Sequence, residues 1–386
     1  MKSTSRTTPQ GNPIPTPSTR TKGTRPAVSR GLELAEGEQV FIGIDVHKAS
    51  YSVAVYSCQR GELVRQWKQP ADAFVLIDSI GPFRQQIVQI VYEAGPTGFE
   101  LARALLAHEF AVAVVAPSLT PEVAARQEKC DRRDAARLAF YASKGTLHPV
   151  AIPTREQEGE RDLVRLREMA VDNAGVQKVQ IKSLLLKYSV SEPEGLKNWS
   201  VAAVKQLLTL KLPSADATEA LQLMVGELYH LNERIKLLTR KIAEIGARPE
   251  HQADVARLRT IPGIGRLTAI LLICELFDPG RFATGEQVSK YLGLAPCVSA
   301  SGQTVRQAGR IEGGNKRLRT ALVEAAWRWV RRDDQAGIRF RELACKTASK
   351  KKAIVAMARR LGLAMWRMLT RGEGYQGFQK CRAEAA

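Results

Sequence analysis

The chain has 386 residues, of which 58 are lysine or arginine and 39 are aspartate or glutamate, a formal net charge of +19. This length is typical of two or three domains. The excess positive charge favours a polyanionic partner such as nucleic acid, although a basic protein without such a partner can have the same composition. The chain has no run of 18 apolar residues and no apolar segment near its start, so we expect neither a membrane span nor a secretory signal. We therefore expect a cytoplasmic protein.

The first 38 residues are rich in threonine, proline, serine, arginine and lysine, with almost no large apolar side chain before Leu32. Such a segment cannot bury enough apolar surface to offset the entropy lost on ordering it. We predict a disordered basic arm over residues 1–38, which either adds phosphate contacts or serves solubility alone.

Residues 39–150 carry short apolar runs typical of strands, followed by strand and helix patterns in alternation. The expected strands are 40–48, 50–57, 62–69, 86–95 and 111–117, and the expected helices lie around 74–80, 98–110 and 121–145. Hairpin-connected strands that then alternate with helices indicate an α/β domain with a mixed sheet and helices on its faces.

The pattern is helical from about residue 156 to 246, so we predict a helical or coiled-coil region over 151–250. Between Leu221 and Ile245, apolar residues recur mostly every three or four positions. That spacing is typical of a coiled coil or helical hairpin, and equally of a helix packed on its neighbours. A mainly helical globular region, 251–345, and a basic helical segment, 346–386, follow.

Four carboxylates stand where a metal site is expected. Asp45 and Glu93 each end an apolar strand, and neighbouring strands that end in carboxylates place both groups at one edge of a sheet. Asp131 and Asp134 are three residues apart and share a helix face. Four converging carboxylates repel one another, and a hard divalent cation such as Mg²⁺ or Mn²⁺ relieves that repulsion. Two such ions can activate an attacking oxygen and stabilise a leaving oxygen in phosphoryl transfer.

Each carboxylate also has a plain structural interpretation. Asp45 can cap a turn, and Glu93 can be an edge residue. The Asp131 and Asp134 pair can form a solvated, salt-bridged helix face with its neighbours Arg132, Arg133 and Arg137. The order of all four along a strand, hairpin, helix and strand layout favours the metal site.

A family resemblance follows from these motifs. Residues 39–145 resemble a RuvC-type, RNase H-like nuclease domain. The order IGIDVHK, VYEAGPTGFELA, VVAPS and KCDRRDAARLA is similar to the DEDD transposases of bacterial insertion sequences, which include bridge-RNA-guided recombinases. The DRRDA segment is the most specific match, with Cys130 where the family often has threonine or another polar residue. The resemblance implies that Asp45, Glu93, Asp131 and Asp134 are the four acidic catalytic positions.

Residues 258–330 resemble the second domain of that family, which supplies a nucleophilic serine. The matching segments are TIPGIG, YLGLAP, a Ser-Gly step, RQAGRI and NKRLRTALVEAAW. The resemblance implies that Ser301 is the nucleophile, with Ser299 as the alternative. The residues alone place both serines in an exposed, mobile Gly- and Ser-rich loop, where most serines have no catalytic role.

Two further features favour nucleic-acid binding. Gly263 and Gly265 lie between two helical patterns, as in a helix-hairpin-helix, where backbone N–H groups can approach a phosphate; a plain connection between two helices is the alternative. A basic cluster follows the serines and either contacts phosphates or forms a solvated face. Its members are Arg306, Arg310, Lys316, Arg317 and Arg319.

The sequence therefore predicts a nucleoid-associated transposase or recombinase that cuts and rejoins DNA with a metal-carboxylate site and a serine. The resemblance further implies a guide (bridge) RNA and a homodimer or homotetramer, in which the two domains form a composite site. Two alternatives stay open: a metal-dependent hydrolytic nuclease of the junction-resolvase kind, and a non-catalytic nucleic-acid-binding protein.

Overall fold

The computed structural model describes residues 33–117, 131–301, 304–308 and 313–377, with the side chains of 131–132, 297–301 and 304–308 left aside. The chain divides into two compact units, residues 1–152 and 153–386. Within the described ranges, no helix is both long enough and apolar enough to cross a membrane.

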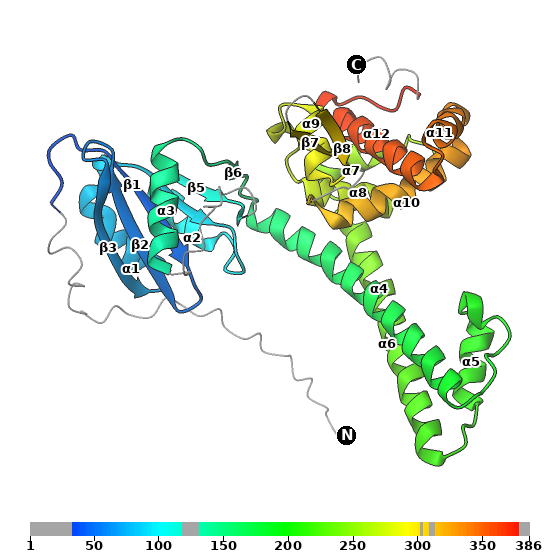
Figure 1. The fold of residues 1–386 in the computed structure, drawn as a ribbon. Helices are drawn as coiled ribbons and strands as arrows, with labels where there is room; N and C mark the ends of the chain where they lie inside the picture. The colour runs from blue at the N-terminus through cyan, green and yellow to red at the C-terminus, as the bar shows by residue number, and fades with distance from the viewer. Residues whose placement is uncertain (1–32, 118–130, 302–303, 309–312, 378–386) are drawn as a thin grey trace, which may run out of the picture. The chain divides into compact units, whose positions relative to one another are not determined.

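The first unit is built on a six-stranded mixed sheet with strand order β3-β2-β1-β4-β5-β6 (Figure 1). β1 (Val40–Val46), β2 (Ser50–Ser57) and β3 (Glu62–Pro70) form an antiparallel meander, and β4 (Ile87–Glu93) and β5 (Val112–Val115) run parallel to β1. β6 (Pro149–Val150) closes the far edge. The mixed sheet predicted from the sequence is confirmed, and its order is that of an RNase H-like domain.

Helices cover both faces of this sheet (Figure 1). α1 (Ala73–Ile80) and α2 (Glu100–Ala107) contribute to the larger core, together with Ile42, Ile44 and Tyr92. η2 (Gly81–Gln86) joins α1 to β4. α3 (Asp131–Ser143) covers the other face, where its Leu138 packs with Val91. Because strand residues alternate between faces, these two cores fix which side each strand residue faces.

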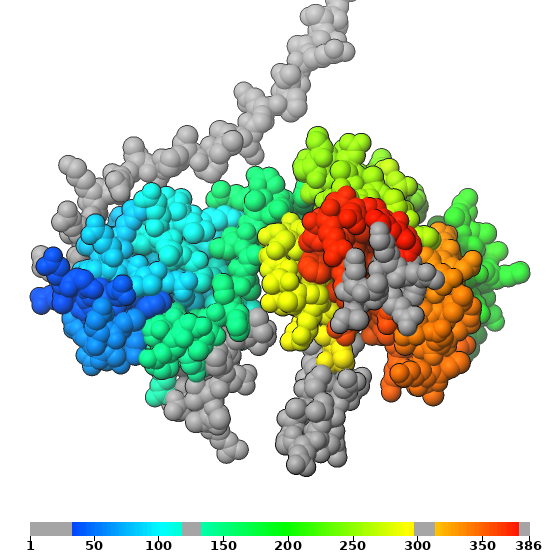
Figure 2. Space-filling view, turned by 90° about the horizontal axis from the view of Figure 1, so that it is seen from above, coloured from blue at the N-terminus to red at the C-terminus, as the bar shows by residue number. Residues whose placement is uncertain are grey.

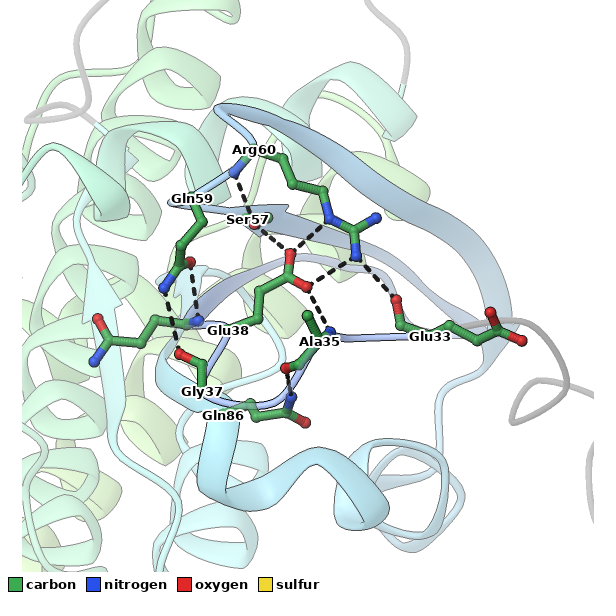
Figure 3. Close-up of polar contacts among 9 residues, drawn as sticks. Glu33, Ala35, Gly37, Glu38, Ser57, Gln59, Arg60 and Gln86 are labelled. Carbon is green, nitrogen blue, oxygen red and sulfur yellow. Dashed lines mark hydrogen bonds and ion pairs between the residues drawn. The ribbon is translucent and has the colours of Figure 1, made fainter.

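The segment before β1 is anchored on the sheet, contrary to the predicted end of the disordered arm at residue 38. The buried Glu38 carboxylate accepts a hydrogen bond from the Ser57 hydroxyl at 2.5 Å and pairs with the Arg60 guanidinium at 2.8 Å (Figure 3). Gln86 donates to the Ala35 carbonyl at 2.8 Å. These partners are distant in sequence, so local composition gave no sign of them. Residues 1–32 of the predicted arm lie outside the described residues.

The second unit begins with a long antiparallel helix pair, α4 (Arg155–Lys187) and α6 (Ala215–Ile245) (Figure 1). Arg167 donates to Thr239 at 2.8 Å, and Gln177 donates to the Met224 carbonyl at 3.0 Å. Residues later in α4 therefore contact residues earlier in α6, as in an antiparallel pair. Ile181, Leu185 and Leu228 are in the core between them.

The region predicted to be helical, 156–246, contains a turn between its two long helices. The chain turns through η4 (Leu196–Asn198) and α5 (Val201–Thr209) before α6 begins. Gly195 and Trp199 flank η4 with left-handed backbone. Proline at 193 and the Ser200 and Ser214 N-caps mark these breaks.

The rest of the second unit is mainly helical, as predicted. α7 (Pro249–Leu258), α8 (Arg266–Leu276), α10 (Lys316–Arg332), α11 (Asp334–Thr347) and α12 (Lys350–Arg371) share one core centred on Trp329. η5 (Pro279–Arg281) and α9 (Gly285–Tyr291) follow α8, and the surfaces of the yellow α9 region and the red α12 meet in Figure 2.

The serines occupy a strand, where the sequence predicts a loop. β7 (Cys297–Ser301) pairs antiparallel with β8 (Thr304–Ala308), and Ser299 is opposite Arg306. Residues 302–303 between them lie outside the described residues. The small residues and the Ser-Gly step indicate a loop. The two short segments are extended because they pair with each other, and the pattern of either segment alone does not show this pairing.

Candidate functional site

Asp45 and Glu93 lie at the same edge and on the same face of the sheet. β1 and β4 are parallel, and Ile44 pairs with Tyr92 one residue before each carboxylate. Tyr92 faces the α1–α2 side, where its hydroxyl accepts from the Ala102 amide at 3.3 Å. Glu93 therefore faces the opposite side, and so does Asp45, two residues beyond Gly43, which contacts α3. Asp45 is 22% exposed, so its carboxylate is accessible.

α3 begins at the edge where these two carboxylates lie. A Cβ on Gly43 would be 2.0 Å from the Ala135 carbonyl oxygen, so the middle of α3 crosses β1 there. Farther along α3, the Phe140 ring lies 5.5 Å from that of Tyr56, which pairs with Phe41 at the start of β1. α3 thus runs antiparallel to β1, and its first turn points toward the carboxyl end of that strand.

That first turn carries the other two predicted ligands. The Asp134 carboxylate is half-buried and pairs with Arg137 at 3.1 Å, the salt bridge that the plain interpretation anticipated. A pair this exposed contributes about 0–1 kcal/mol, so it leaves Asp134 free to exchange Arg137 for a stronger cation. The backbone of Asp131 starts α3, and its side chain lies outside what the structure describes.

Three polar neighbours of Asp45 were not singled out from the sequence. The His47 ring nitrogen Nε2 lies 3.0 Å from Asp45 Oδ2. Ser52 of β2 pairs with Asp45 of β1, and Lys68 of β3 pairs with Ser52. Asp45, Ser52 and Lys68 therefore form one row across three strands, on the face of the sheet that α3 covers. The i to i+2 spacing of Asp45 and His47 on the strand predicted over 40–48 was the one signal available in the sequence; the other two residues are placed by the strand register.

The row includes an orphaned hydroxyl. Ser52 Oγ is buried, with the side chain 2% exposed, and makes no hydrogen bond within the described part of the chain. A buried hydroxyl without a partner costs about 1–3 kcal/mol, so it points to a partner that binds there. Together with the oxygen donors of Asp45, Glu93 and Asp134, it fits a hard divalent cation with bound water.

A second group of possible ligands is in the other unit. Glu160, Glu250 and His251 offer ligand atoms within 4.8 Å of one another, beside a pocket lined by Gln157 and Phe277. Glu160 already pairs with Arg248 at 2.5 Å and lies 2.9 Å from His251 Nε2. A guanidinium beside the carboxylate opposes a second cation, so we interpret this group as an ion-pair network.

The predicted phosphate-binding turn is a short connection between α7 and α8. Gly263 has φ +91 and lies against α10, where Arg328 Nε donates to its carbonyl at 3.2 Å. Exposed Gly265 is the N-cap of α8, with no side-chain hydrogen bond to cap the helix. The backbone geometry therefore requires glycine at 263, and the α8 N-terminus is open to solvent.

The predicted basic cluster divides by environment. Lys316 is exposed, whereas Arg317 pairs with Glu168 at 2.6 Å and Arg319 is near the Gly293 carbonyl at 3.5 Å. Arg306 is on β8 with its side chain outside the described residues, and Arg310 lies outside them altogether. The structure thus brings Lys316, Arg317 and Arg319 together on the first turn of α10.

The fold and the carboxylate edge define a class: an RNase H-like nucleic-acid enzyme domain joined to a mainly helical unit. Family comparison refines this class. Residues 255–341 match the model of the transposase IS116/IS110/IS902 family, and residues 42–190 match the DEDD transposase model of the IS110 type. The chain belongs to the IS110 family of transposases.

Named relatives agree with this assignment. A putative transposase y4qE from Sinorhizobium fredii is 32% identical over 88% of this chain and 90% of its own length. The transposase for insertion sequence element IS1533 from Leptospira borgpetersenii is 25% identical, covering 75% and 85%. Among solved structures, T. thermophilus RuvC in complex with a Holliday junction substrate matches 29% of this chain and 99% of its own, at 14% identity and a TM-score of 0.22.

Proposed function

We propose that this transposase cuts and rejoins the DNA of its insertion sequence through two groups of residues, a metal-binding carboxylate centre in 39–150 and a serine in 251–345. The observation that carries the proposal is the shared edge and face of Asp45 and Glu93, toward which the first turn of α3 brings Asp131 and Asp134. A bound Mg²⁺ or Mn²⁺ would supply Lewis-acid polarisation of a phosphoryl oxygen.

Ser301 is the proposed nucleophile, with Ser299 as the alternative. Its Oγ attacks a DNA phosphorus, the bond from phosphorus to one deoxyribose oxygen breaks, and the hydroxyl proton ends on that departing oxygen. The phosphoserine retains the energy of the phosphodiester, so attack by a second strand end can rejoin DNA without ATP. Ser299 and Ser301 both lie on β7, two residues apart along the strand.

The covalent adduct tests this function. Wild-type protein is incubated in Mg²⁺ with a supercoiled plasmid that carries the element and its flanks, and DNA-linked protein is isolated under denaturing conditions. We expect the adduct with wild type and with Ser299→Ala, and none with Ser301→Ala. Adduct with Ser301→Ala but not Ser299→Ala assigns the attack to Ser299. Metal-dependent cutting without any adduct establishes the rival function, a hydrolytic nuclease.

A guide RNA is part of the same proposal. The net charge of +19 and the exposed Lys316 support a polyanionic partner, DNA or RNA. RNA that copurifies with the protein from cells carrying the element is sequenced. We expect a transcript from the element's own non-coding flank, and a DNA-cutting activity that ribonuclease abolishes. Full activity after ribonuclease treatment contradicts the guide.

The long helix pair supports a homodimer, the smaller of the two assemblies that the resemblance implies. α4 carries a stripe of exposed apolar side chains at heptad-like spacing, 55–79% exposed; they are Met169, Val176, Val179 and Leu186. Such a stripe is typical of a helix that packs against a further helix. Light scattering after size exclusion should show a dimer for wild type and a monomer for Leu186→Glu. Val201→Glu, an equally exposed apolar residue on α5, is the matched control.

A further inference from the structure

The two ends of the β7–β8 hairpin meet at a close contact between two glycines. Gly293 precedes β7 and Gly314 follows β8, with φ +65 and +73. A Cβ on Gly314 would lie 2.3 Å from the Cα of Gly293, and the Asn315 amide donates to the Tyr291 carbonyl at 2.7 Å. The chain entering the hairpin and the chain leaving it are therefore in direct backbone contact.

Glu275 of α8 contacts both sides of this junction. Its carboxylate accepts a hydrogen bond from Asn315 Nδ2 at 2.9 Å, and its backbone carbonyl accepts one from the Tyr291 hydroxyl at 2.7 Å. Asn315 uses its other amide atom, Oδ1, to cap α10, accepting from the amides of Arg317 and Leu318 at 3.0 and 3.2 Å. One asparagine thus connects the buried glutamate, the hairpin and the helix that follows it.

The carboxylate of Glu275 is itself held from α4. It is fully buried, and Arg165 donates to both of its oxygens, at 2.8 and 3.0 Å. Burial raises the pKa of this carboxyl, but Arg165 and Asn315 lower it by more, so the net pKa lies below its ordinary value. An ionised carboxylate with three side-chain donors is a rigid acceptor, because a lost donor leaves a buried charge uncompensated.

We infer that Glu275 is a positioning residue for the serine hairpin, acting through Asn315 and Tyr291. The inference rests on the proposed function of that hairpin. A two-stranded hairpin is marginally stable by itself, and β7 and β8 pair only with each other in the described sheets. Its placement therefore depends on its base, where Glu275 holds Tyr291, before β7, and Asn315, seven residues after β8.

The test separates the anchor from the helix cap. In Asn315→Ser the hydroxyl still caps α10, but the donor to Glu275 is gone. We expect backbone amides in 297–308 to exchange with deuterium about tenfold faster, the equivalent of one hydrogen bond lost, and adduct formation on the element plasmid to slow by a similar factor. Amides of α6 should keep their wild-type exchange rates.

Two further variants complete the design. Tyr291→Phe removes the other contact to Glu275 with little change of shape, and should speed hairpin exchange in the same direction. Thr239→Val removes the Arg167 contact between α4 and α6 and is the matched control, with no expected change at the hairpin. Wild-type exchange across 297–308 in both Asn315→Ser and Tyr291→Phe would overturn the inference.

The outcomes also separate this inference from the proposed function. A wild-type protein that forms no adduct contradicts the serine reaction and, with it, any role of Glu275 in that reaction. A wild-type protein that forms the adduct, with Asn315→Ser unimpaired in adduct formation, contradicts the positioning role alone.

Discussion

The carboxylate centre and the serine hairpin are held in place by different means. Asp45 and Glu93 lie at the ends of central strands of a six-stranded sheet, where Asp45 pairs with Ser52 of β2 and Glu93 with Val115 of β5. Ser301 ends a strand of a two-stranded hairpin whose position depends on contacts at its base. We therefore expect the first site to be sensitive mainly to changes of its own ligands, and the second to changes of residues far from the serine in sequence.

The largest effect is expected at the carboxylate centre. Asp45→Asn keeps the shape of the side chain but weakens metal binding, and several kcal/mol of lost stabilisation corresponds to about a 10³-fold slower cut. Strand cleavage of the element plasmid in Mg²⁺ measures this. Asp72→Asn, which preserves the α1 cap in the same unit, should cut at the wild-type rate. Asp45→Asn within tenfold of wild type, or wild-type cutting that EDTA leaves unchanged, removes the metal assignment.

The close contact of β1 with α3 comes next. Gly43→Ala places a Cβ 2.0 Å from the Ala135 carbonyl oxygen, and backbone on both sides must move. We expect the free energy of unfolding of the first unit to fall by about 3 kcal/mol, measured by the urea dependence of amide hydrogen exchange in β1. Gly81→Ala is the control, since φ there is −52 and nothing lies within 4 Å of the added Cβ. Equal stability of the two variants would show that α3 does not press on β1.

The hairpin base offers a comparison between adjacent glycines. Gly313 and Gly314 both have positive φ, +71 and +73, but only a Cβ on Gly314 meets backbone, that of Gly293. Gly313→Ala is therefore destabilised by backbone strain alone, about 1–2 kcal/mol. Gly314→Ala has the same strain and, in addition, a steric clash of its Cβ with the backbone of Gly293. We expect adduct formation to slow about tenfold more in Gly314→Ala than in Gly313→Ala. Equal rates would mean that the glycine contact does not position the hairpin.

The smallest effect concerns the anchored segment before β1. The Ser57 hydroxyl and the backbone amide of Ala35, with Arg60, hold the pKa of Glu38 below its ordinary value of 4.5. A carboxyl with a lowered folded pKa contributes stability above its unfolded pKa, and this contribution is lost as pH falls through the folded value. The stability difference between wild type and Glu38→Gln, from urea denaturation, should be constant from pH 7 to 5 and shrink below 4.5. A difference independent of pH would contradict the lowered pKa.

Local sequence was sufficient for most of the first unit. The apolar runs gave the strands β1 to β5 and their mixed sheet, and strand ends placed Asp45 and Glu93 where the structure has them. Asp45 and Glu93 share one edge of the sheet because β1 and β4 are parallel neighbours, and the carboxyl ends of parallel neighbouring strands lie at the same edge. Ser52 could not be selected from the sequence, because its place beside Asp45 depends on strand register, and His47 lies one residue beyond the end of β1.

Long-range contacts decided the rest. Ser299 and Ser301 lie in a strand because β8 pairs with β7. Glu38 is anchored on the sheet by Ser57 and Arg60, which are 19 and 22 residues away along the chain. The two side chains that donate to the Glu275 carboxylate, Arg165 and Asn315, lie 110 residues before it and 40 residues after it in the sequence. Residue type and spacing determine strands, helices and candidate ligands. Which polar groups meet is decided by chain segments that pack together only in the folded protein.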